Sequence, residues 1–220
     1  LPPSVTPDSV DLETALQLGA SPEVTNAVRF AFWGGSKEQL AGSLRYVAAL
    51  NRDQLNDIAV YLNFDELASP NAGFFTYDGD QSGPQSPDID PEEVPTGSAG
   101  VERTLASYLY TTGKRPADMP LGVASDDSAF LHAGVPIGGM TTGTTQVKSK
   151  TQARLWGGEA GVPFDPNYGT PRDDLAAINR DALAVMGAGV AFAVGTYADS
   201  LTGVNGVPPR AQRHRSAVGP

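Results

Sequence analysis

Segments with apolar residues at every third or fourth position alternate along the chain with short runs that are almost continuously apolar. The first pattern is typical of amphipathic helices and the second of buried strands. Helices are predicted at residues 12–18, 37–50, 101–112, 128–133 and 180–201. Strands are predicted at residues 28–33, 58–65, 73–77, 120–123 and 135–139, and residues 78–97 and 147–171 are predicted to be irregular. This alternation predicts an α/β fold with a mostly parallel sheet flanked by helices.

The last predicted helix contains a long uncharged stretch, residues 182–198. Asn179 precedes it at the position where an asparagine side chain caps a helix. The stretch has 17 residues, rich in Ala and Gly, whereas a membrane span requires roughly 20 strongly apolar residues. We therefore interpret it as a buried helix and expect no transmembrane segment. The first residues lack the basic start and apolar run of a signal peptide, so we expect none in this chain.

Polar residues follow several predicted strands, where ligands bind in α/β sheets. Residues 34–37, 65–66 and 125–127 are expected to meet at this rim of the sheet. Paired acids in the last two groups can serve acid–base or metal chemistry. However, neighbouring strand residues point to opposite faces, so each pair supplies at most one inward carboxylate. Because the chain holds 25 acidic residues, solvated surface pairs remain the alternative interpretation.

Composition excludes several classes of site. The 220 residues include no Cys, which excludes disulfides, Cys-ligated zinc, iron–sulfur clusters and a cysteine nucleophile. The two histidines, His132 and His214, are too few for a multi-histidine metal site. With 15 basic and 25 acidic residues, the net charge is −10. This acidity argues against a nucleic-acid partner.

The charge is distributed unevenly between two parts of the chain. Residues 207–220 contain three arginines and no acid, so they are predicted to form a flexible Pro/Arg-rich tail. Residues 1–206 are predicted to form one α/β domain. The sequence contains neither a phosphate-binding P-loop nor a G-x-S-x-G nucleophile motif.

The loop from Asp78 resembles the beginning of a calcium-binding loop. Asp78, Asp80 and Ser82 place oxygen-bearing side chains at alternate positions, and Gly83 occupies the sixth position. The twelfth position, where calcium loops have Glu, is Ile89. A solvated turn is therefore the simpler interpretation, and calcium the alternative.

Seven stretches, in this order and spacing, resemble the zinc aminopeptidases of the M28 type, in particular actinobacterial secreted and lipoprotein aminopeptidases. They are LETAL (12–16), VRFAFWG (28–34), LNFD (62–65), FFTYD (74–78), GVPIGG (134–139), LWGG (155–158) and FDPNY (164–168). The resemblance covers residues 12–201. It implies a zinc-aminopeptidase-like fold that is shortened at its N-terminus, because the family's opening strands and first metal ligand would lie before Leu1. It also implies an extracytoplasmic or cell-envelope location.

The family's site holds two zinc ions that activate water, and a Glu acts as the general base. The resemblance places Pro3 at the position of the bridging Asp and Ser36 at the position of the base. Lys37 and Gly169 stand at the positions of two further ligands, while Asp65 is a ligand that is retained. One carboxylate cannot hold zinc, which takes about three protein ligands in catalytic sites.

Two further family positions bear on catalysis. Ala124 stands where some members have an assisting Arg, and Tyr168 is retained. Lys37 would repel a metal dication and could instead form a salt bridge with Asp65 that replaces the metal.

These replacements favour a degenerate, non-catalytic M28-type protein that acts as a binding or structural subunit. A peptide is one expected ligand, and another chain or a homo-oligomer is expected to cover the exposed sheet edge. The alternative is an active zinc aminopeptidase whose ligands are completed by another segment or chain. A third hypothesis is a different hydrolase that uses Asp65, Asp126 or His132. No cofactor is expected for the non-catalytic protein, and zinc or calcium are the alternatives.

Overall fold

The computed structural model describes residues 5–20, 23–35 and 38–216. A four-stranded sheet forms its centre, with the strand order β1-β4-β2-β3. The strands are β1 (Tyr61–Phe64), β2 (Phe75–Tyr77), β3 (Ala117–Met119) and β4 (Ile137–Thr141). β1 pairs with β4 in parallel and β2 with β3 in parallel, whereas β2 and β4 are antiparallel. The predicted mostly parallel sheet is therefore confirmed.

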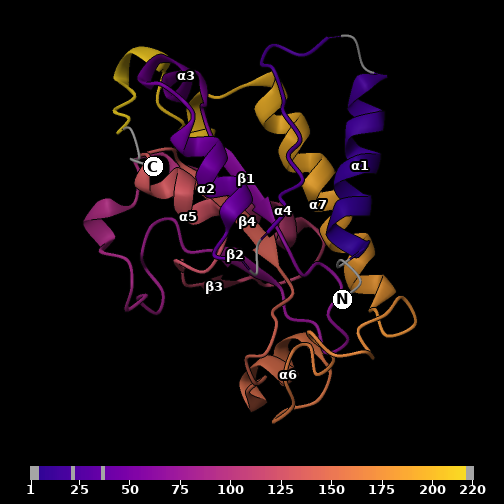
Figure 1. Ribbon diagram of the computed structural model, residues 1–220. Helices are drawn as coiled ribbons and strands as arrows, with labels where there is room; N and C mark the ends of the chain where they lie inside the picture. The colour runs from indigo at the N-terminus through magenta and orange to yellow at the C-terminus, as the bar shows by residue number, and fades with distance from the viewer. Residues whose placement is uncertain (1–4, 21–22, 36–37, 217–220) are drawn as a thin grey trace.

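Helices cover both faces of the sheet (Figure 1). On one face lie α4 (Ser98–Thr111) and α7 (Arg180–Asp199), and α1 (Val5–Gly19) packs on α7. The other face carries α2 (Ala41–Ala48) and α5 (Asp127–His132), with α3 (Arg52–Asp57) beside them. α6 (Lys150–Trp156) lies beyond one end of the sheet in Figure 1. Short 3-10 turns occupy η1 (Pro91–Glu93), η2 (Gly203–Asn205) and η3 (Arg210–Gln212).

Two hydrophobic cores lie on opposite faces of the sheet. The first joins α4 and α7 and includes Leu105, Met140 and Val190. The second lies under α2 and α5 and includes Phe130 and Ile137. Met140 and Ile137 both belong to β4, so this central strand contributes to both cores. Burial on both faces explains the almost continuous apolar sequence of the central strand.

Glycines on β4 permit the close packing of its neighbours. A Cβ atom at Gly138 would lie 2.3 Å from a methyl carbon of Val101 on α4. A Cβ atom at Gly139 would lie 1.8 Å from the backbone oxygen of Asn63 on β1. Neither position can therefore hold a larger residue without displacing the adjoining helix or strand.

Several predicted elements differ from the observed ones. Residues 28–33 form no strand, because their backbone has no hydrogen-bonded neighbour among the described residues. A strand forms at β3 rather than at residues 120–123. Within the segment 147–171, α6 forms where Ser149 and Gln152 make a capping box. The N-cap predicted at Asn179 is confirmed, because its side chain accepts a hydrogen bond from the backbone of Ala182.

Residues 207–216 pack against the domain in the structure, in the segment for which the sequence predicts a flexible tail. Val207 is buried in the first core. Arg215 is also buried, and its guanidinium donates hydrogen bonds to the carbonyl oxygens of Leu55, Ile58 and Gly134. Basic residues at a chain end indicate flexibility only when their side chains find no hydrogen-bond acceptors on the folded domain. Here backbone carbonyls at the end of α3 and in the turn after α5 supply those acceptors.

By length and composition, α7 could cross a membrane, and 44% of its apolar window is buried inside the protein. One such helix is weak evidence for a span, because core helices have the same composition. Its contacts with α1 and α4 favour the predicted core helix. The absence of a transmembrane segment from this protein stays a prediction.

Candidate functional site

A large cleft lies between β1 and the segment 26–33, with a volume of about 1270 Å³. Asp65 and Glu66 follow β1 into this cleft, and Ser125 and Asp126 reach it from the start of α5. The loop that follows α6 adds residues 168–170. Polar residues that follow different elements thus meet at the C-terminal end of β1, where ligands bind in α/β folds.

The cleft contains most of the described positions that the family resemblance singled out. Asp65, Ala124, Tyr168 and Gly169 all line it. Pro3, Ser36 and Lys37 lie outside the described residues, so the roles assigned to them, and the Lys37–Asp65 salt bridge, stay predictions.

A chain of side-chain hydrogen bonds crosses the floor of the cleft. The indole N–H of Trp33 donates to the hydroxyl of Tyr61 at 2.9 Å, and that hydroxyl donates to Asn63 Oδ1 at 3.2 Å. Asn63 in turn donates to the hydroxyl of Ser125 at 3.1 Å. The chain links the segment 26–33, β1 and the start of α5. It therefore holds these three walls of the cleft in register.

Negative charge is concentrated at the end of the cleft near Asp65. Asp65 reaches the solvent inside the cleft, but the surrounding protein raises the pKa of its carboxyl through desolvation, and the charges of Asp126 and Asp8 raise it further. Burial and Asp8 likewise raise the pKa of Asp11 to about 6. Burial and the nearby Glu66 raise the pKa of the Tyr168 hydroxyl. A cation in this end of the cleft would relieve the repulsion among the acids.

Asp127, the neighbour of Asp126, lies behind the cleft wall. Its side chain is buried, and Oδ1 has no hydrogen-bond partner among the described residues. Burial raises the pKa of its carboxyl to about 6. The charge of Asp126 raises this pKa further, whereas a hydrogen bond from Ser125 lowers it. The expected rim segment 125–127 therefore divides into two residues that face the cleft and one that faces the core.

The described residues of the cleft do not fit zinc. At the family's positions, Asp65 offers one carboxylate, whereas Gly169 has no side chain and Ala124 offers only a methyl group. The other described acids of the cleft do not lie close enough together to share a metal ion. Catalytic zinc takes about three protein ligands. Within the described ranges, acids close enough to share a metal ion occur only as a group of three that does not line the cleft: Asp78, Asp80 and Glu102.

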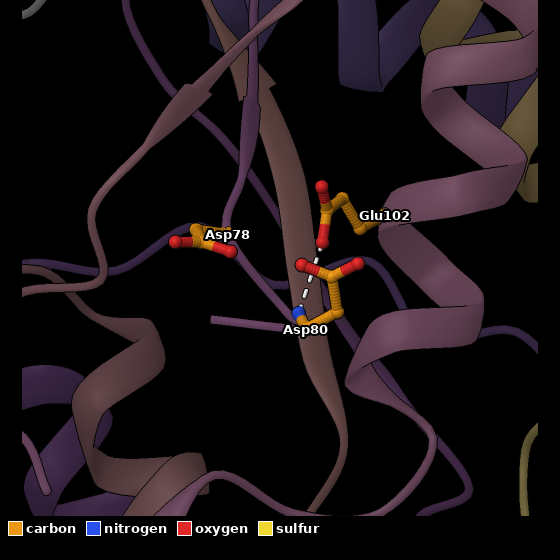
Figure 2. A group of neighbouring side chains, drawn as sticks. All are labelled: Asp78, Asp80 and Glu102. Atoms are coloured by element: carbon orange, nitrogen blue, oxygen red, sulfur yellow. Dashed lines mark hydrogen bonds between the residues drawn. The ribbon is translucent and has the colours of Figure 1, made fainter. Parts of the chain in front are cut away.

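Figure 2 shows that Glu102 projects from α4 toward the loop that holds Asp78 and Asp80. Its Oε2 accepts hydrogen bonds from the backbone N–H groups of Gly79 and Asp80, at 2.9 and 3.0 Å. Desolvation and the neighbouring acids raise the pKa of Glu102 to about 7, although its hydrogen bond from Asp80 lowers it. Glu102 thus binds the loop from another element, so a motif based on residue spacing within the loop could not identify it.

The geometry around Asp78 differs from the predicted calcium loop. Its two carboxylate oxygens accept the backbone N–H groups of Ser82 and Gly83, both at 3.0 Å. Ile89, at the twelfth position, is buried in the second core. These hydrogen bonds already organise the loop without an ion. Calcium binding by Asp78, Asp80 and Ser82 stays an untested alternative.

One sequence candidate, His132, and one missed residue, Ser43, complete the placement. His132 is exposed at the end of α5, where its Nδ1 lies 2.7 Å from the Ser128 oxygen, and it does not line the cleft. It therefore stands apart from Asp65 and Asp126, with which the third hypothesis grouped it. Ser43 on α2, which sequence reasoning missed, donates a hydrogen bond to Asp126. Only the packing of α2 on α5 brings these two residues together.

Comparison with known proteins identifies the family, because peptidase family M28 matches residues 9–194. The chain belongs to peptidase family M28. A probable lipoprotein aminopeptidase, LpqL, from Mycobacterium tuberculosis is 55% identical over 207 residues, which cover 94% of this chain and 41% of that protein. A probable leucine aminopeptidase 2 from Aspergillus fumigatus is 42% identical over 85% of this chain and 36% of its own length. The M28 chain thus spans about two fifths of the length of these relatives.

Solved structures support the same fold. A zinc aminopeptidase from Bacillus subtilis, BSAP, superimposes with a TM-score of 0.65 at 22% identity, over 90% of this chain and 42% of that one. An aminopeptidase from an Aneurinibacillus strain gives a TM-score of 0.59 at 22% identity, over 84% of this chain and 36% of that one. The predicted zinc-aminopeptidase-like α/β fold is therefore confirmed.

Proposed function

We propose that this M28 chain binds polypeptide in the cleft beside β1 without hydrolysing it. The observation that carries the proposal is the side-chain set in the cleft, which keeps the family's Asp65 but has Gly169 where a further ligand is expected. Other acids line the same cleft, but among the described residues they do not lie close enough to Asp65 to share a metal ion, and catalytic zinc takes about three protein ligands. Apolar walls and an acidic end remain, and these suit a bound peptide with a cationic group.

Its location is proposed to be extracytoplasmic or at the cell envelope. The support is the relative from Mycobacterium tuberculosis, which is described as a probable lipoprotein aminopeptidase. The role as a pseudoenzyme subunit, rather than as a free enzyme, belongs to the same proposal.

The alternative is an active zinc aminopeptidase whose ligands come from another segment or chain. Its support is that Asp65 and Tyr168 are both retained and both face the same cleft. A supplied ligand would still have to compensate for Gly169, which lacks a donor atom. The non-catalytic proposal requires no such compensation.

Zinc content, hydrolysis and peptide binding, measured on one preparation, test the proposal. After incubation with zinc and dialysis, we expect no stoichiometric metal and no release of product from leucine p-nitroanilide. We expect a lysine-containing peptide to bind, and Asp65→Asn to weaken that binding. Asp88→Asn, an exposed acid outside the cleft, is the matched control.

Stoichiometric zinc with turnover would overturn the non-catalytic proposal and establish the aminopeptidase alternative. Turnover that persists in a chelator would instead establish a hydrolase of another kind. Failure of every peptide to bind would overturn the binding role.

A further inference from the structure

Lys148 is a buried lysine, with 1% of its surface exposed. Its ammonium group donates hydrogen bonds to the carbonyl oxygens of Ala72 and Gly157, at 2.8 and 2.9 Å. It also lies 5.5 Å from the ring centre of Phe164, a distance at which an aromatic face attracts a cation. Lys148 forms no ion pair within the described ranges. Because a buried charge is costly unless hydrogen bonds replace its lost water, these contacts fix the ammonium in place.

Two glycines of the LWGG stretch shape the backbone around this ammonium. Gly157 and Gly158 have positive φ angles of 80° and 79°, which residues with side chains rarely adopt. A Cβ atom at Gly158 would lie 2.8 Å from Nζ of Lys148 and 2.1 Å from Oδ1 of Asn71. The two glycines are therefore required by the close approach of the chain to Lys148 and Asn71.

Lys148 connects two loops that both reach the cleft. The loop 65–74 follows β1 and holds one acceptor oxygen, that of Ala72. The loop 157–170 follows α6 and holds the other, that of Gly157. Residues from both loops line the cleft, whereas Lys148 does not. The ammonium is thus a direct link, from behind the cleft, between two of its walls.

Asn71 makes a second link between the same two loops. Its side chain accepts the backbone N–H of Glu159 at 3.0 Å and donates to the oxygens of Glu159 and Pro163, at 2.9 and 3.2 Å. Its own backbone N–H donates to the Phe164 oxygen at 2.9 Å. These hydrogen bonds fix the second loop as far as Phe164, four residues before Tyr168.

Tyr168 lies at the acidic end of the cleft, together with Asp65 and Glu66. Burial raises the pKa of the Tyr168 hydroxyl, and the charges of Glu66 and Asp65 raise it further. Tyr168 and Asp65 belong to different loops, so their proximity depends on the groups that join these loops. Side chains that support a binding residue from behind commonly decide how precisely it is held.

We propose that Lys148 is a positioning residue of the cleft, whose buried ammonium joins the loop 65–74 to the loop 157–170 and so keeps Tyr168 beside Asp65. Lys148 itself contacts no ligand and acts through Tyr168. The inference rests on the proposed binding function, to which it adds a residue outside the cleft.

Fluorine NMR of the intact chain labelled with fluorotyrosine follows the position of Tyr168. Tyr168→Phe assigns its resonance among those of the seven tyrosines. Lys148→Met keeps a stem of similar length but lacks the ammonium, so we expect the Tyr168 resonance to move by more than its line width. The resonance of Tyr110, an exposed residue on α4, should stay in place. Lys150→Met, at an exposed lysine nearby, is the matched control and should move neither resonance.

The ammonium can also be restored chemically, because the chain contains no Cys. The thiolate of unfolded Lys148→Cys displaces bromide from bromoethylamine, which rebuilds a side chain of lysine length with a terminal ammonium. Bromopropane gives a side chain of the same length that ends in a methyl group. After refolding, we expect the aminoethyl form to regain the native Tyr168 resonance. We expect the propyl form to bind an acetylated, amidated heptapeptide of alternating lysine and valine at least threefold more weakly than the aminoethyl form.

The outcomes separate this inference from the proposed function. An unchanged Tyr168 resonance in Lys148→Met, or the same resonance in the aminoethyl and propyl forms, would overturn the positioning role and leave the binding function intact. Equal peptide affinity of the two forms would also overturn it. Because the resonances require no ligand, they decide the inference even if no peptide binds, a result that would overturn the proposed function.

Gly158→Ala is the second variant and decides the question if Lys148→Met does not fold. It retains the lysine, but its Cβ would crowd both Asn71 and the ammonium. We expect it to move the Tyr168 resonance and to leave that of Tyr110 in place. A native Tyr168 resonance in Gly158→Ala would overturn the positioning role.

Discussion

The indole N–H of Trp33 donates to the hydroxyl of Tyr61 at 2.9 Å and so joins the segment 27–33 to β1 across the cleft. The Tyr61 ring also stacks on Phe130, with ring centroids 3.9 Å apart and planes inclined by 5°. Tyr61 thus connects the segment 27–33, which finds no strand partner among the described residues, to the second hydrophobic core. The position of one cleft wall depends on this side chain.

Removal of the Tyr61 hydroxyl should loosen that wall. Tyr61→Phe keeps the ring stacking but removes the hydrogen bonds with Trp33 and Asn63, so we expect the free energy of unfolding to fall by about 1–2 kcal/mol. Urea denaturation measures the change. Tyr110→Phe, at an exposed ring on α4, is the matched control and should have little effect. Equal losses in both variants would contradict the structural role of the Tyr61 hydroxyl.

Arg215 should contribute far more to stability than its neighbour Arg210. Arg215 is buried and donates to three backbone carbonyls. Arg215→Ala removes these charge-assisted hydrogen bonds and takes the guanidinium from the Ile58 and Gly134 oxygens, so it should cost about 3 kcal/mol. Arg210 forms an exposed ion pair with Asp57, and exposed pairs contribute little. Thermal denaturation of both alanine variants checks this order. A reversed order, or equal losses, would show that residues 207–216 do not dock as described.

Asp127 should make the protein less stable as the pH rises. The folded protein retains the proton of this carboxyl up to about pH 6, whereas an unfolded aspartate releases it near pH 3.8. The stability contributed by the protonated, buried carboxyl is therefore lost between these two values. Asp127→Asn does not titrate, so at pH 7.5 it should be more stable than the native protein by about 2–3 kcal/mol, and about equal to it near pH 4.

Urea denaturation at pH 4 and pH 7.5 provides this measurement. Asp88→Asn, at an exposed position, is the control and should show the same pH dependence as the native protein. A stability difference between Asp127→Asn and the native protein that does not change with pH would contradict the assigned proton.

The predicted salt bridge between Lys37 and Asp65 can be tested from the side of Asp65. If the ammonium group neutralises this carboxylate, Lys37→Ala should raise the pKa of Asp65 further and lower the free energy of unfolding by more than about 0.5 kcal/mol. NMR titration of the Asp65 carboxyl and urea denaturation measure the two effects. Lys150→Ala, at an exposed position, is the control. An unchanged pKa of Asp65 would rule the pair out.

Local sequence patterns predicted most elements correctly where the signal lies within the element itself. Asn179 caps α7 because its own side chain reaches the backbone of Ala182. The segment 28–33 shows the limit of such reasoning. Its composition favours a strand, yet a strand requires a neighbouring backbone, and none of the described residues provides one.

Some residues of the candidate sites could likewise be identified from the sequence, and others only from the structure. The resemblance to the M28 peptidases identified Asp65, Tyr168 and Gly169 as related positions, and the fold brings all three to one cleft. Glu102 could not be found in this manner, because it lies on α4 and meets Asp80 only through packing of that helix beside the loop. Ser43 and Asp126 meet through the packing of α2 on α5 for the same reason.

The amino-acid sequence by itself determined the α/β class and the family, because each depends on residue identity and on spacing along the chain. Only the tertiary structure decided that residues 28–33 find no strand partner among the described residues, and that Arg215 anchors the segment 207–216. These properties depend on which backbone groups find partners, and partners distant in sequence meet only after the helices and the sheet have packed.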